Sequence, residues 1–180
     1  MTLHTVFKGR PGLEENRKEA EVRTYDFLDG LGIEYLRIDH PPAMTMDDCQ
    51  EIDTALGVKM CKNLFLCNRQ QTDFYLLLTD ADKKFQTKVL SEQLGVSRLS
   101  FGSEEDMVRL LGVTPGSVSV FSLINDKDIK VRLIIDSDLL KNNYIGAHPC
   151  VNTSSLRISV KDLMEKIIPS TGHFAETVDL

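Results

Sequence analysis

The sequence has 180 residues and lacks any apolar run near the roughly 20 residues that a membrane-spanning helix needs. Its first twelve residues also lack the apolar core of a secretory signal. Both absences favour a cytoplasmic protein. The length suits one domain with a substantial core, so residues 1–180 are expected to form a single unit.

Cysteine pairs are also missing. The four cysteines form no CxxC pair, and no histidine is spaced from them to complete a zinc site. They are Cys49, Cys61, Cys67 and Cys150. We therefore expect reduced, mostly buried thiols, no structural disulfide, no metal and no cofactor.

Positive charge is in deficit, because the sequence has 21 basic residues against 27 acidic ones, and its net charge is −6. A general nucleic-acid-binding protein is usually basic overall, so the balance disfavours that class. It leaves room for a small local patch that touches RNA. Lys83, Lys84 and Lys88, followed by Arg98, are the candidates for RNA contacts, with an ordinary solvated surface as the alternative.

Hydrophobic periodicity and turn residues predict alternating helices and strands. Helices are expected at 13–31, 46–56, 87–94, 103–111 and 160–168. Strands are expected at 34–38 and 98–101, and in two hairpins, 62–67 with 74–79 and 118–124 with 130–135. Hairpins imply antiparallel pairing, so the fold class is α+β with a mixed sheet. Residues 1–12 are expected to be a loose arm and 169–180 a surface tail.

Three segments carry residues that suit chemistry. Lys62 begins an apolar strand, where an ammonium can hold a phosphate or polarise an ester. Gly116 follows a proline in a turn, where backbone amides can approach an anion closely. His148 precedes a proline and can act as a base near neutral pH. Each residue alone also fits a structural role: a strand-end lysine, a turn glycine and a buried histidine.

In their order along the chain, these segments resemble one known family. The motifs are Lys-Asn-Leu-Phe-Leu, Leu-Gly-Val-Thr-Pro-Gly-Ser-Val, Ile-Asn-Asp and His-Pro followed by Asn-Thr. Together they resemble the YbaK/ProX family of prolyl-tRNA editing domains over about residues 15–168, and most closely its free-standing, PrdX-type alanyl-tRNA(Pro) deacylases. The resemblance implies a YbaK-like α+β fold with packed helices on a mixed, mostly antiparallel sheet curved around the site.

The same resemblance implies an activity and partners. The reaction would be hydrolysis of the aminoacyl ester at the 3′ end of tRNA(Pro), without a cofactor. Lys62 matches the family's essential lysine, which engages the terminal adenosine and its phosphate, and His148 matches the histidine that lines the aminoacyl pocket. The tRNA(Pro) acceptor end would be the partner, and prolyl-tRNA synthetase a second one whose requirement the sequence leaves open.

Further positions follow from the resemblance. Gly116 and Ser117 match a Gly-Ser loop beside the substrate, Asn152 and Thr153 match the Asn-Thr pair, and Arg98 falls where relatives recognise the acceptor stem. One departure concerns the synthetase-embedded pattern Gly-x-x-x-His-Pro. Tyr144 stands four residues before His148, and Gly146 lies closer to it. This departure favours the free-standing branch.

Alanine is smaller than proline, so a proline-activating pocket discriminates poorly against it and a second, smaller sieve is needed. Met44, Leu64 and Val118 are candidates for its walls. Two alternatives stay open: a cysteinyl-tRNA(Pro) deacylase on the same scaffold, and a non-catalytic module that binds tRNA or a synthetase. Cys150 lies two residues after His148, but a nucleophilic pair needs a third, orienting group, so covalent catalysis is disfavoured.

Overall fold

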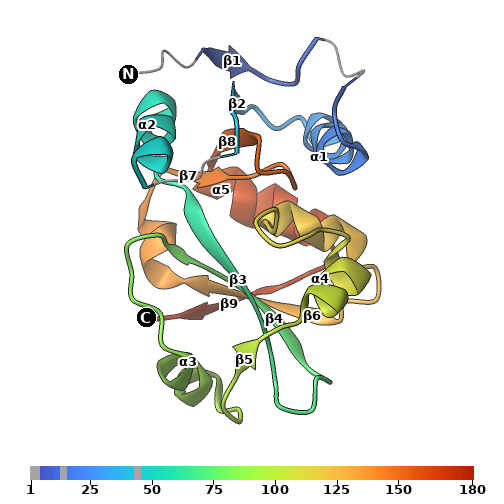
Figure 1. The fold of residues 1–180 in the computed structure, drawn as a ribbon, viewed down its shortest axis with the longest axis vertical. Helices are drawn as coiled ribbons and strands as arrows, with labels where there is room; N and C mark the ends of the chain where they lie inside the picture. The colour runs from blue at the N-terminus through green and yellow to red at the C-terminus, as the bar shows by residue number, and fades with distance from the viewer. Residues whose placement is uncertain (1–4, 13–15, 43–45) are drawn as a thin grey trace.

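The computed structural model describes residues 5–12, 16–42 and 46–180, and two sheets form its framework (Figure 1). The four-stranded sheet has the order β1-β2-β8-β7, and the five-stranded sheet has the order β5-β3-β4-β6-β9. The strands are β1 (Val6–Lys8), β2 (Leu36–Asp39), β3 (Cys61–Cys67), β4 (Phe74–Asp80), β5 (Ser100–Phe101), β6 (Val131–Asp136), β7 (Tyr144–Ala147), β8 (Ser154–Ser159) and β9 (Ala175–Val178).

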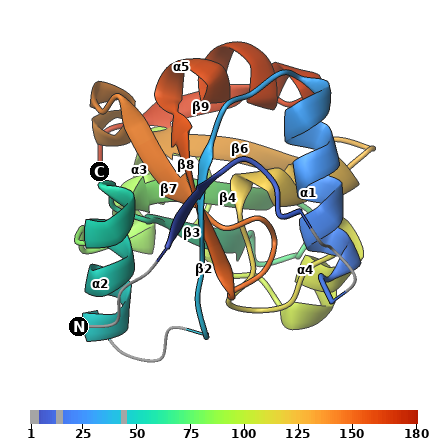
Figure 2. The same cartoon turned by 90° about the horizontal axis from the view of Figure 1, so that it is seen from above.

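The helices lie around these sheets, and α1 and α2 flank strands β1, β2 and β8 on opposite sides (Figure 2). They are α1 (Glu19–Gly30), α2 (Met46–Leu56), α3 (Thr87–Leu94), α4 (Glu104–Leu111), the 3-10 helices η1 (Val120–Asn125) and η2 (Ser137–Lys141), and a last helix formed by α5 (Val160–Asp162), the π-turn η3 (Leu163–Ile167) and α6 (Ile168–Ser170). Among the described residues, no helix is long and apolar enough to cross a membrane.

Local signals account for the best-predicted elements. The hydroxyl of Ser103 accepts a hydrogen bond from the amide of Asp106 at 3.1 Å and caps α4, and Gly112 ends that helix with φ of 65°. Gly95, with φ of 64°, ends α3 in the same way. The hairpin of β3 and β4 is also confirmed, with Cys61 opposite Asp80 and Cys67 opposite Phe74.

The second predicted hairpin is wrong. Residues 120–125 form the helix η1, because the Ser119 hydroxyl accepts from the amide of Phe121 and Ser122 completes a capping box. Strand β6 pairs instead with β4, and the two strands run parallel. A short apolar run fits a strand or a buried helix equally well, so periodicity could not separate them. The sheets remain mostly antiparallel, and the α+β class is confirmed.

Both chain ends differ from the expected loose segments. Residues 6–8 form β1, which pairs with β2 as an exposed edge strand. Residues 175–178 form β9, which runs parallel to β6 and buries Val178. Strands of three or four residues are too short to show a period of two, which explains why the sequence did not reveal them.

The five-stranded sheet has an apolar layer on each face. Successive side chains of a strand point to opposite faces. Leu76 and Leu78 of β4 face the main core, which lies toward the four-stranded sheet, and Tyr75 and Leu77 face a smaller core under α3 and β9. The same alternation sorts the side chains of β3, and this decides which of them reach the candidate site.

Candidate active site

A cavity of about 290 Å³ on the main-core face brings several predicted residues together. We call it the His148 cavity. His148, from the segment after β7, and Leu64, from β3, both line it. Gly116 and Val118 line it from the segment between α4 and η1. Its volume lies just below the usual range for small-molecule sites, about 300–1,000 Å³.

His148 is placed by an unusually close approach of two chain segments. The amide of Gly146 in β7 donates to the carbonyl of Lys59 at 3.0 Å, just before β3. A side chain at position 146 would begin only 2.6 Å from the sulfur of Met60 and 2.9 Å from the Lys59 carbonyl oxygen. Glycine is therefore required for β7 to reach β3, and β7 leads directly to His148.

The tautomer of His148 follows from its hydrogen bond. Its Nδ1 lies 3.1 Å from the carbonyl oxygen of Ser154. A carbonyl can only accept, so Nδ1 carries the proton and the neutral ring keeps a lone pair on Nε2. Burial lowers the pKa of His148, the Ser154 carbonyl opposes the shift and the nearby His40 adds to it. At neutral pH the imidazole is thus uncharged and ready to accept a proton.

A buried polar chain holds Ser154 in place behind His148. The Ser154 hydroxyl donates to the carbonyl of Ile38 at 3.2 Å and lies 3.4 Å from the hydroxyl of Tyr25. Tyr25 in turn donates to a carboxylate oxygen of Glu21 at 2.7 Å. Burial raises the pKa of Tyr25, so it stays a donor. The chain links α1 to the start of β8 and fixes the carbonyl that orients His148.

The turn at 114–117 also lines the cavity, through Pro115 and Gly116. The amide of Ser117 donates to the carbonyl of Thr114 at 3.1 Å, and Gly116 has φ of 84°. These values fit a type II turn, which needs glycine at this position. Gly116 and Pro115 line the cavity, whereas the buried Ser117 closes the turn and is not among the lining residues.

The structure does not bring Lys62 into the His148 cavity. Lys62 is not among the lining residues of the cavity, although its neighbours Cys61 and Asn63 are, and it lies on the face of β3 that Leu66 presents to the smaller core. There its ammonium donates to the carbonyl oxygen of Lys83 at 3.1 Å. The expected contact between Lys62 and the ester carbonyl is therefore not supported by this placement.

Asn152 and Thr153 are also separated from the cavity. Thr153 lines a different hollow, beside Arg17 and Asp39, and its carbonyl accepts from the amide of His40 at 3.0 Å. Asn152 is half-buried and is not among the lining residues of the His148 cavity. Met44 lies outside the described residues.

The four predicted tRNA-binding cations fall into two groups. The ammonium of Lys83 lies 2.7 Å from a carboxylate oxygen of Asp136 and 2.6 Å from one of Asp138, so it is engaged within the fold. Lys88 pairs weakly with Glu92 on α3, at 3.8 Å. Lys84 and Arg98 are exposed, and neither forms an ion pair with another described residue.

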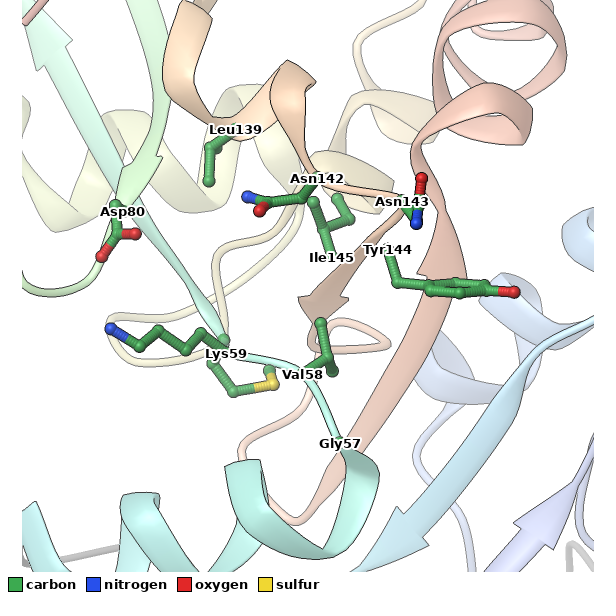
Figure 3. Close-up of a pocket in the computed structure, with 10 residues that line it drawn as sticks. Gly57, Val58, Lys59, Asp80, Leu139, Asn142, Asn143, Tyr144 and Ile145 are labelled. Atoms are coloured by element: carbon green, nitrogen blue, oxygen red, sulfur yellow. The ribbon is translucent and has the colours of Figure 1, made fainter.

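A larger cavity of about 420 Å³ lies between the ends of α2 and η2, and none of the predicted site residues lines it. Figure 3 shows Lys59 and Asp80 on one side of it and Asn143 and Tyr144 on the other. The smaller His148 cavity is therefore the candidate active site, because it alone of the two gathers the residues with suitable chemistry.

The sequence analysis missed several lining residues, including Asn63, Phe101 and Met107. Asn63 could have been found from β3 itself, since it is the polar member of the alternating set that contains Cys61 and Phe65. Burial raises the pKa of Cys61 to about 12 and also raises that of Cys150. Both thiols stay protonated, and Cys150 lies against the Ser122 hydroxyl at 3.7 Å, not in the cavity.

The fold and the His148 cavity can now be compared with known protein families. Residues 40–166 match the sequence profile of the aminoacyl-tRNA editing domain, and the chain belongs to this family. The membership confirms the predicted family and the predicted class of enzyme, an aminoacyl-tRNA deacylase.

Individual proteins similar to this chain carry more specific names. The prolyl-tRNA editing protein ProX of Acetoanaerobium sticklandii is 33% identical over 85% of this chain and 93% of its own. The prolyl-tRNA synthetase associated domain-containing protein 1 of Mus musculus is 29% identical over 88% of this chain and 93% of its own. A crystal structure assigned provisionally to a trans-editing enzyme for prolyl tRNA synthetase shares the fold, with a TM-score of 0.66 at 16% identity over 91% of this chain and 98% of its own.

Proposed function

We propose that this protein hydrolyses the ester of alanyl-tRNA(Pro) and so removes alanine attached in error. The observation that carries the proposal is the His148 cavity, a small space lined by both a neutral histidine and a glycine turn. The walls include Leu64, Met107 and Val118, which suit a small apolar side chain. The name of the relative ProX, a prolyl-tRNA editing protein, supports tRNA(Pro) as the carrier.

The proposed reaction needs a base and a site for negative charge. Nε2 of His148 accepts a proton from a water molecule as its oxygen attacks the ester carbonyl. The amides of Gly116 and Val118 donate to no other described residue, so they are available to the carbonyl oxygen as charge develops on it. The ester bond then breaks, and the proton passes from His148 to the leaving ribose oxygen, which yields free alanine and tRNA.

Lys62 takes a different part in this proposal. Its ammonium lies near the start of β3, where it donates to the carbonyl oxygen of Lys83, and Lys62 is not among the lining residues of the His148 cavity. We assign it to a phosphate of the acceptor end, in line with the family resemblance, and not to the ester carbonyl. Loss of a phosphate contact raises KM, whereas loss of a carbonyl contact lowers kcat by about 10²–10³-fold.

The test is a deacylation panel with alanyl-, cysteinyl- and prolyl-tRNA(Pro). We expect the wild-type protein to release alanine fastest and to leave prolyl-tRNA(Pro) intact. His148→Ala should lower kcat about 10²–10⁴-fold, the usual contribution of a general base. Lys62→Ala should raise KM with little change in kcat.

Cys150→Ser is the matched control, and it should keep full activity because this thiol is buried outside the cavity. Faster release of cysteine than alanine would replace the proposed substrate with cysteinyl-tRNA(Pro). A protein that binds tRNA but hydrolyses none of the three esters would be a non-catalytic module, and the proposal would be wrong.

A further inference from the structure

We propose that Phe101, supported by Phe85, is the surface on which the terminal nucleobase of the charged tRNA stacks. The inference rests on the proposed function and extends it from the ester to the nucleoside that carries it. It assigns a substrate-positioning role to two aromatic residues outside the family motifs described above.

Phe101 is exposed and yet adjoins the candidate active site. Its side chain is 64% exposed, and it lines the His148 cavity. It belongs to β5, the edge strand that pairs with β3, and Figure 1 shows β5 between α3 and α4. Single exposed apolar residues are common on protein surfaces. Phe101 differs from such a residue because it lines the cavity that holds the catalytic candidate. It lies opposite Leu66, on the face of the sheet from which Leu64 also lines this cavity.

The backbone holds Phe101 at this place. The amide of the next residue, Gly102, donates to the carbonyl of Phe65 at 2.9 Å. A side chain at position 102 would collide with the ring of Phe65. Glycine therefore lets the chain lie flat against β3. The Phe101 ring also makes an edge contact with Phe85, with ring centroids 6.3 Å apart and planes at 68°, so one side of it is supported and a large part stays open.

The substrate presents a flat group at a matching position. In an aminoacyl-tRNA the ester joins the amino acid to the last ribose, and the base is attached to the same ribose. When the aminoacyl group enters the His148 cavity, the base must remain outside, within one sugar ring of the rim. Unpaired bases at RNA ends bind proteins chiefly by stacking on aromatic side chains.

Positive charge lies beside this aromatic pair. Lys84 directly precedes Phe85, and Arg98 lies just before β5. Both are exposed, and neither is paired with an acid in the described part of the chain, in contrast to Lys83. Two exposed cations thus lie next to the aromatic pair along the chain, and they suit the phosphates of a single strand within a protein whose net charge is −6.

The first experiment is steady-state deacylation of alanyl-tRNA(Pro) by Phe101→Ala. Loss of one stacked base should raise KM about 5- to 100-fold and leave kcat nearly unchanged, because the reacting groups stay in place. Phe101→Tyr should restore KM, since it keeps the ring. Phe174→Ala is the matched control, because Phe174 is 85% exposed and is not among the residues lining the cavity. An unchanged KM for Phe101→Ala would overturn the inference.

The second experiment reports on stacking without catalysis. The protein contains no tryptophan, so Phe101→Trp introduces a single indole at the proposed contact. Uncharged tRNA(Pro) should quench its fluorescence, and the same tRNA without its terminal adenosine should quench it far less. Phe174→Trp should respond to neither. Equal quenching by both RNAs, or none, would refute base stacking at Phe101.

The two experiments separate this inference from the proposed function. If the wild-type protein hydrolyses no charged tRNA, the proposed function fails, and the fluorescence titration still decides whether the terminal base lies on Phe101. If hydrolysis is observed but neither KM nor fluorescence depends on position 101, the function stands and the inference fails.

Discussion

The two faces of strand β3 differ in chemistry although their side chains alternate along one short motif. Cys61 and Asn63 line the His148 cavity, and none of the described residues that line it carries a charge. Lys62 lies on the other face, where its ammonium donates to the backbone carbonyl of Lys83, whose own ammonium pairs with Asp136. The comparison shows that neighbours in a motif need not share a site, because a strand sends consecutive side chains to opposite faces.

The charged face connects parts of the chain that are far apart. The Lys83 ammonium bridges Asp136 at the end of β6 and Asp138 in η2, and it donates to the backbone carbonyl of Leu180 at 2.7 Å. Asp136 is fully buried and also accepts from the Thr79 hydroxyl at 2.8 Å. This face therefore stabilises the loop after β4, whereas the cavity face offers room for a ligand.

Removing the charge of Lys83 should have the largest effect on stability. Lys83→Met leaves the buried carboxylate of Asp136 without its cation, and breaking such a pair costs about 3 kcal/mol or more. Urea unfolding followed by circular dichroism measures this loss directly.

Lys84→Met is the control for that measurement, because Lys84 is exposed and has no ion pair within the described residues. Its free energy of unfolding should stay within about 0.5 kcal/mol of the wild-type value. Equal values for the two variants would show that the charged face contributes nothing to stability, and the contrast between the faces would be lost.

A methyl group at position 146 should disturb the cavity face at its tightest point. Gly146→Ala forces β7 away from Met60 and should cost about 1–3 kcal/mol, as overpacking does elsewhere. It should also lower deacylation, because β7 carries His148. Gly30→Ala is the matched control: no atom lies within 4 Å of the added carbon at the end of α1, so stability should rise slightly. Wild-type stability and activity in Gly146→Ala would contradict the required close approach.

Much of this arrangement could be predicted from the sequence where the signals are local. The cap at Ser103, the glycine ends of α3 and α4, and the hairpin of β3 and β4 all follow from turn chemistry and periodicity. The ordered motifs also predicted that His148 and Gly116 belong to one site, and both line the same cavity.

Other features depend on contacts between distant segments. The parallel pairing of β6 with β4 and β9 is set by the whole sheet, and no residue within β6 signals it. The direction of Lys62 follows from alternation only once it is known which face of β3 meets His148. The engagement of Lys83 needs Asp136, which lies far along the chain and is buried only in the folded protein.

The smallest effect concerns the charge state of the cavity face. Burial lowers the pKa of His148 below its ordinary value near 6.5, so the folded protein binds a proton there less readily than the unfolded chain. Stability from this residue is therefore fully present above about pH 6.5 and is lost as the pH falls from there toward the folded-state pKa, by at most about 1.4 kcal/mol per pH unit. His148→Asn should show a correspondingly shallower loss between pH 7.5 and 5.5 in urea unfolding, and because both proteins keep His40 and His173, the difference between their slopes reports His148 together with its interaction with His40. Identical slopes would mean that the cavity accepts a charged imidazole, and the distinction between a neutral face and a charged face of β3 would no longer hold.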